Sequence, residues 1–110
     1  MISLHVYLTP KSGLEIDLDR AVREGWLTAM AEQPGFIGAA VVKPFPDEEL
    51  DALGASKPDS SIEAISFWRS EQERLEWVAR PIHDEVFDRV MEASQHVSYT
   101  LQTVEQSWLI

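Results

Sequence analysis

Two kinds of hydrophobic period follow each other along this chain, and their order limits the folds open to it. Residues 2–9 read ISLHVYLT, in which every second side chain is apolar, as in a strand with one buried face. Residues 13–32 carry apolar side chains at steps of three and four, which is typical of an amphipathic helix. A turn at Pro34 and Gly35 then precedes the short apolar run 36–43, which predicts a second strand. The chain therefore begins as strand, helix, strand.

The second half of the chain repeats this order. Residues 61–69 read SIEAISFWR and predict a third strand, and residues 96–105 alternate again and predict a fourth. A helical pattern begins after Ser70 and lies between them. Pro81 interrupts it, because proline removes a backbone donor and crowds the preceding turn. We expect a kinked helix, or two helices that meet near Arg80.

Two capping boxes mark the expected helix starts. Ser12 precedes Glu15 by three positions, and Ser70 precedes Glu73 by the same spacing. In such a box the serine side chain accepts a hydrogen bond from the backbone N–H three residues later. We therefore predict a serine-capped start for both helices.

Residues 44–60 form a long connection between the second and third strands. They include three prolines, Gly54 and the acidic run DEELD at 47–51, and predict no more than one helical turn before the glycine. The acidic run lacks the spaced ligands and the glycine of a calcium loop. We predict a solvated acidic surface here and no metal site.

The order strand, helix, strand, strand, helix, strand is that of ferredoxin-like domains. We predict an α+β fold, ferredoxin-like β-α-β-β-α-β, with a four-stranded antiparallel sheet in one domain over residues 1–110. Two helices cover one face of such a sheet and leave the other open, so we expect a homodimer built sheet to sheet. The apolar end formed by Trp108, Leu109 and Ile110 is an expected added contact.

Composition and charge exclude several classes of function. The 9 Lys and Arg against 19 Asp and Glu give a net charge of −10, which repels phosphate backbones and anionic membranes, so we predict no nucleic-acid partner and no membrane partner. The absence of cysteine excludes thiolate nucleophiles and cysteine-bearing zinc sites. The start of the sequence is not typical of a targeting segment and no apolar run reaches membrane-spanning length, so a cytoplasmic protein is expected.

Three segments resemble the antibiotic biosynthesis monooxygenase superfamily of dimeric α/β barrels: KSGLEIDLDRAV, QPGFIGAAVV and SFWRSEQERLEWVARPIHDEVF. The turn Pro34-Gly35-Phe36 resembles the family's helix-to-strand turn, and Phe67-Trp68-Arg69-Ser70 resembles its strand leading into the second helix. His83 resembles a histidine that many members carry near a break in that helix. The resemblance implies a cofactor-independent oxygenase of small aromatic substrates, although many members have no established activity.

His83 is the candidate catalytic residue. As a general base it would take a proton from an activated C–H or phenol, so that the resulting anion itself reduces dioxygen without a cofactor. The alternative is structural, because a histidine beside a proline break also caps free carbonyls or faces water. A non-catalytic dimeric module that binds a hydrophobic metabolite, or only assembles, is the corresponding alternative function.

Four aromatic or imidazole side chains are candidate substrate-binding residues. His5 and Tyr7 project from one face of the first strand, where they would line a pocket or a subunit interface. Trp68 and Trp77 would form an aromatic wall, or fill the core. The pattern leaves open which face of the sheet lines a pocket. We expect the break at Pro81 to turn His83 toward the space between the second helix and the sheet. There Trp68 or Trp77, together with His5 or Tyr7, would bound a small aromatic or hydrophobic ligand.

Overall fold

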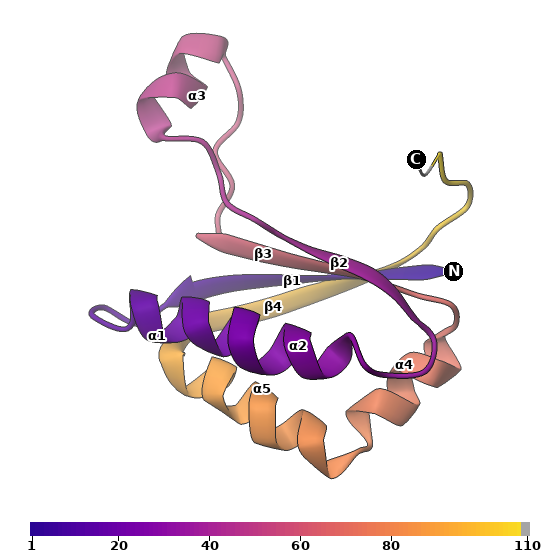
Figure 1. The fold of residues 1–110 in the computed structure, drawn as a ribbon. Coiled ribbons are helices and arrows are strands. Elements are labelled where there is room, and N and C mark those ends of the chain that lie inside the picture. Colours follow the sequence, from indigo (N-terminus) through magenta and orange to yellow (C-terminus); the bar gives the residue numbers. More distant parts are fainter. Residues whose placement is uncertain (109–110) are drawn as a thin grey trace.

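A four-stranded antiparallel sheet carries helices on one face (Figure 1). The computed structural model describes residues 1–108. The strands are ordered β2-β3-β1-β4, and each neighbouring pair is antiparallel. The predicted α+β arrangement is therefore confirmed. The strands are β1 (Ile2–Pro10), β2 (Phe36–Val42), β3 (Ile62–Trp68) and β4 (Ser94–Thr103).

The central strand β1 separates two different environments. Leu4, Val6 and Leu8 are buried and face the helices, because side chains alternate between the two faces of a strand. His5 and Tyr7 project from the other face, which no helix of the layer below covers (Figure 1). We call this second surface the open face. It lies over β1 and its neighbours β3 and β4.

The first helical segment is continuous but changes its period. It consists of α1 (Glu15–Arg20), the π-helix η1 (Ala21–Trp26) and α2 (Leu27–Met30). The predicted capping box at its start is wrong. Leu14 occupies the N-cap position without a side-chain hydrogen bond, because Gly13 adopts a φ of 86° and turns the chain before the helix begins.

The second helical segment is divided as the proline predicts. Ser70 accepts a hydrogen bond from the N–H of Glu73 at 3.2 Å and so caps α4 (Glu71–Val78). Arg80 is extended, with ψ at 142°, and Pro81 is the first residue of α5 (Pro81–Ala93). The residue before a proline avoids the helical region, which explains the break. Two helices therefore meet near Arg80.

The connection between β2 and β3 stands away from the sheet. It contains α3 (Asp47–Leu53), which is longer than the single turn expected and ends at Gly54 with a φ of 68°. Figure 1 shows α3 and the C-terminal segment on the side of the open face, opposite the other helices. Lys57 pairs with Asp51 at 3.1 Å across its base.

The core lies between the sheet and the helices. Trp68 and Trp77 are its largest fully buried side chains, and the indole N–H of Trp68 donates to Ser66 Oγ at 3.1 Å. Within residues 1–108, no helix is long and apolar enough to cross a membrane.

Gly35 lies in the turn that precedes β2, and this turn packs closely against α4. Its φ is 87°, and a Cβ added there would lie 2.6 Å from the Cβ of Glu73. Glu73 cannot easily move, because its carboxylate accepts from Arg69 Nε at 2.9 Å and from Ser70 Oγ at 3.1 Å. We expect Gly35→Ala to lower the free energy of unfolding by about 2 kcal/mol or more, measured by urea denaturation.

Gly38→Ala is the matched control. Gly38 lies in β2, three residues after Gly35, its φ is not positive, and an added Cβ meets no atom within 4 Å. We expect this variant to equal or slightly exceed the wild-type stability, because alanine loses less backbone entropy than glycine. Equal stabilities for the two variants would contradict the proposed clash with Glu73.

Candidate functional site

A cavity of about 360 Å³ lies between the sheet and the helical layer. Its floor comes from β1 and β4, and its walls come from η1, α2, α4 and α5. Most of its lining is apolar, and its polar side chains are few, which is the usual composition of a small-molecule site. The lining residues are Leu4, Val6, Trp26, Met30, Arg74, Trp77, Val78, His83, Phe87, Met91, Val97 and Tyr99.

The break at Pro81 sets the face that α5 turns toward this cavity. His83 lies in the first turn of α5, and its backbone N–H donates to the carbonyl of Arg80 at 3.0 Å. Phe87 and Met91 follow at steps of four, so the three side chains share one face of the helix. Because α5 starts anew after the break, this face is set independently of α4.

Four rings form a row along the helical wall of the cavity. The ring centroids of Trp26 and Phe87 are 5.1 Å apart, those of Phe87 and His83 are 5.5 Å apart, and those of His83 and Trp77 are 5.1 Å apart. The imidazole is nearly parallel to Phe87 and meets Trp77 edge to face. We call these four residues the aromatic row. It offers a flat ligand several stacking partners.

The imidazole of His83 has one nitrogen engaged and one free of protein partners. Its Nδ1 lies 3.2 Å from Asp84 Oδ1, and a carboxylate only accepts, so Nδ1 carries the proton. Within residues 1–108, Nε2 has no hydrogen-bond partner, and the side chain is 14% exposed. In a neutral imidazole with this hydrogen bond, Nε2 carries the lone pair, which is the state a general base needs.

Arg74 brings a cation to the same cavity. It precedes Trp77 by one helical turn on α4, and its Nε donates to Glu71 Oε1 at 2.6 Å. Trp26, at the other end of the aromatic row, has a buried Nε1 without a partner within residues 1–108. No motif in the sequence marks Arg74, Trp26 or Phe87 as site residues, although the spacing from Arg74 to Trp77 is that of one helical turn.

The structure brings together only part of the predicted site. His83 and Trp77 both line the cavity, whereas Trp68 is fully buried in the core and lies outside the lining. His5 and Tyr7 lie on the open face, with the sheet between them and His83. These two residues therefore do not bound a ligand held by His83. A binding role for them stays a prediction about the open face.

The open face carries a polar network around His5. Its Nδ1–H donates to Glu63 Oε2 at 2.8 Å, and its Nε2 lies 3.0 Å from Ser3 Oγ. Serine, histidine and carboxylate are connected here as in a catalytic triad. However, β1 is a central strand whose backbone amides serve both neighbouring strands, and Ser3 is 4% exposed. The network therefore lacks amide donors for an oxyanion and access for a substrate.

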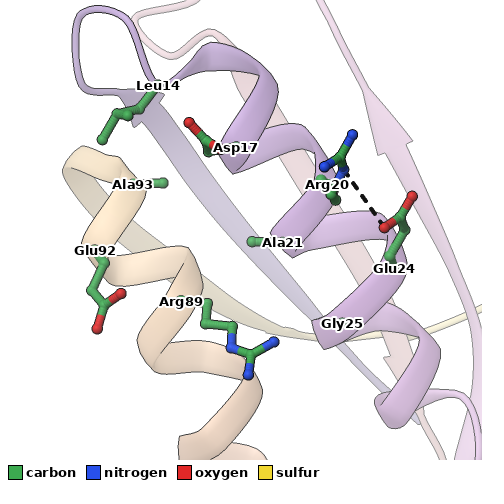
Figure 2. Close-up of a pocket in the computed structure, with 9 residues that line it drawn as sticks. All are labelled: Leu14, Asp17, Arg20, Ala21, Glu24, Gly25, Arg89, Glu92 and Ala93. Atoms are coloured by element: carbon green, nitrogen blue, oxygen red, sulfur yellow. Dashed lines mark ion pairs between the residues drawn. The ribbon is translucent and has the colours of Figure 1, made fainter.

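A wider groove runs between α1, η1 and α5 (Figure 2). Its cavity volume is about 580 Å³, and charged side chains of both signs surround small residues such as Ala21 and Gly25. Arg20 and Glu24 pair across one turn at 3.7 Å on its rim. With neither a histidine nor an aromatic side chain in its lining, this groove has less to offer catalysis than the cavity at His83.

The described residues show no metal-binding cluster. Within residues 1–108, no group of three His, Asp or Glu side chains is placed to hold an ion. The lining of the cavity at His83 offers an imidazole, a guanidinium and aromatic rings.

Comparisons with known proteins bear on the fold. Neither a family model nor a curated protein matches this chain. Solved structures do match. SnoaB, a cofactor-independent oxygenase from Streptomyces nogalater, superposes with a TM-score of 0.74 and 16% identity over 96% of this chain and 94% of its own.

Two further structures extend the comparison. A Deinococcus radiodurans protein provisionally described as an antibiotic biosynthesis monooxygenase matches with a TM-score of 0.73 and 14% identity over 100% of this chain and 98% of its own. A dimeric protein of ferredoxin-like fold from Bacteroides fragilis matches with a TM-score of 0.68 and 9% identity over 91% and 92%. The chain therefore shares its fold with these three proteins, as the resemblance seen in the sequence led us to expect.

Proposed function

We propose that this chain is a cofactor-independent oxygenase that oxidises a small aromatic substrate in the cavity at His83. The observation that carries the proposal is the state of the imidazole. It lies in an apolar cavity, its Nδ1–H is held by Asp84, and its Nε2 has no partner within residues 1–108. A base oriented by a carboxylate beside an aromatic row is a suitable arrangement for proton abstraction from a flat, acidic C–H or phenol.

In this mechanism His83 Nε2 takes a proton from an activated CH₂ group of the substrate. The carbanion transfers one electron to dioxygen, which gives a substrate radical and superoxide, and their recombination forms the C–O bond of a peroxide. Return of the proton from His83 assists cleavage of the O–O bond, with loss of the second C–H proton. The balance is one CH₂ and one O₂ converted to one C=O and one H₂O.

The apolar lining supports this chemistry in two ways. Leu4, Val6 and Met30 keep water from the carbanion, so it is not simply reprotonated by solvent. The aromatic row from Trp26 to Trp77 holds a flat ring against the imidazole of His83, so that the reacting atoms are close and correctly oriented. Electrons come from the substrate itself, so the proposal needs no flavin, haem or metal.

We also propose a homodimer formed through the open face. Ile65 and Phe67 contribute apolar side chains to this face beside the polar network of His5. Leu53 in α3 and Trp108 in the C-terminal segment are 70% and 80% exposed, and both segments lie on this side of the sheet (Figure 1). Pairing would cover these surfaces. The predicted contacts of Leu109 and Ile110 lie outside the described residues.

The catalytic proposal predicts a large effect of His83→Ala on oxygen uptake. With quinol-type bicyclic aromatics as substrates, we expect turnover to fall about a hundredfold or more, since the general base is lost. Thermal melts should show a folded protein, because the change removes a partly exposed side chain that caps no helix. An oxygen electrode and circular dichroism measure the two outcomes.

His96→Ala is the matched control, because His96 is an exposed histidine on β4 outside this cavity. Its oxygen uptake should equal that of the wild type. Uptake unchanged by His83→Ala would reject the catalytic assignment. A loss of about 1 kcal/mol of stability with ligand binding intact would instead favour the structural role of His83 and the non-catalytic module.

The dimer proposal predicts a solution mass near twice the 12.5 kDa of one chain at micromolar concentration. Phe67→Asp should lower this mass toward one chain, because it places a charge in the middle of the open face. Ile16→Asp should not, since Ile16 is exposed on α1 at the helical face. Light scattering that gives a monomer for the wild type would contradict the proposal.

A further inference from the structure

Arg74 is the most buried of the Arg and Lys side chains that form described ion pairs. Its side chain is 13% exposed, whereas the other Arg and Lys side chains with described ion pairs are between 46% and 71% exposed. It lines the apolar cavity rather than the outer surface. Burying a guanidinium is costly unless its donors are used. The free-energy cost of burying Arg74 is therefore offset if a group in the cavity accepts hydrogen bonds from its guanidinium.

Most donors of Arg74 are not used by the protein. A guanidinium has five N–H groups, and Glu71 accepts from only the Nε of Arg74. The two terminal nitrogens have no hydrogen-bond partner within residues 1–108. They are not among the fully buried orphan nitrogens of that part of the chain, which are Trp26 Nε1 and Arg80 Nη1. The terminal fork of Arg74 is therefore both unpaired and accessible.

The electrostatics of the cavity suit an anion. Arg74 is the cationic side chain of its lining, and no Asp or Glu belongs to the lining. Glu71, which offsets part of the charge, is on the outer side with a half-exposed side chain. The lining of the cavity, with an arginine and no carboxylate, thus differs from the chain as a whole, whose net charge is −10. An anionic group in the cavity would meet the terminal N–H groups of Arg74, and the Glu71 carboxylate that pairs with the Nε of this arginine is not among the lining residues.

Resting on the proposed aromatic site, we infer that its ligand is an aromatic carboxylic acid whose carboxylate binds the terminal nitrogens of Arg74. The planar fork of arginine matches a carboxylate with two parallel hydrogen bonds. Arg74 lies one turn from Trp77, so the ring of such a ligand extends along the aromatic row toward His83. A phosphate dianion fits less well, because one guanidinium leaves a second charge uncompensated in an apolar cavity.

The experiment compares 2-naphthoic acid with 2-naphthamide, its neutral isostere, by isothermal titration calorimetry at pH 7.5 and low salt. Both present the same bicyclic ring, so the ratio of their dissociation constants isolates the charge. We expect the wild type to bind the acid at least about tenfold more tightly than the amide, the scale of a charge-assisted hydrogen bond.

Variants assign this preference to Arg74. Arg74→Met keeps an apolar stem and should abolish the preference while leaving the affinity for the amide within about twofold. Glu71→Gln removes the competing carboxylate and should increase the preference for the acid. Arg89→Met is the control, because Arg89 lines the separate groove of Figure 2, and it should change neither affinity.

The outcomes separate this inference from the proposed function. If the wild type binds acid and amide equally, or Arg74→Met keeps the preference, the inference is wrong and the aromatic site stands. If neither naphthalene binds, the aromatic site and the inference fall together. Should Arg74→Met fail to fold in thermal melts, Glu71→Gln decides, since an unchanged preference in that variant would overturn the role of Arg74.

Discussion

The alternation of side chains along β1 is the constraint on which the rest of the structure depends. As the central strand, β1 contributes Leu4, Val6 and Leu8 to the face that the helices cover. The same strand presents His5 and Tyr7 to the open face. A shift of one residue in register would exchange the two sets and bury a histidine and a tyrosine under the helices. The core, the cavity and the open face therefore all follow from this one strand.

Much of the fold was predictable because each element carries a local signal. The first and last strands showed a period of two, Ser70 capped α4 as its spacing predicted, and Pro81 divided the second helix. The capping box at Ser12 failed although its letters were right, since the turn at Gly13 decides where the chain enters the helix. The spacing of Ser12 and Glu15 alone does not specify the backbone geometry at Gly13.

The site was predictable only in part, because its residues come together through packing. His83 was predicted from the helix break and the resemblance, and Trp77 as a large aromatic side chain that would form a wall with Trp68. Trp26 and Phe87 join them only when the first and second helical segments lie against each other at ring distances near 5 Å. The alternation along β1 correctly predicted that His5 and Tyr7 lie on the same face of the sheet. Their separation from His83 depends on which face the helices cover, and no local pattern contains that fact.

The charge of the whole chain and the charge of the cavity act over different distances. A net charge of −10 repels an approaching anion through the solvent, and physiological salt screens this repulsion beyond about 8 Å. Contact with the partly buried fork of Arg74 acts at hydrogen-bond distance, where salt screens it much less. Moderate salt thus weakens the long-range repulsion of the anion more than it weakens the contact between the anion and Arg74. A chain of negative net charge with Arg74 in its cavity is therefore compatible with an anionic ligand, and the net charge disfavours polyanions, whose many charges cannot all reach Arg74.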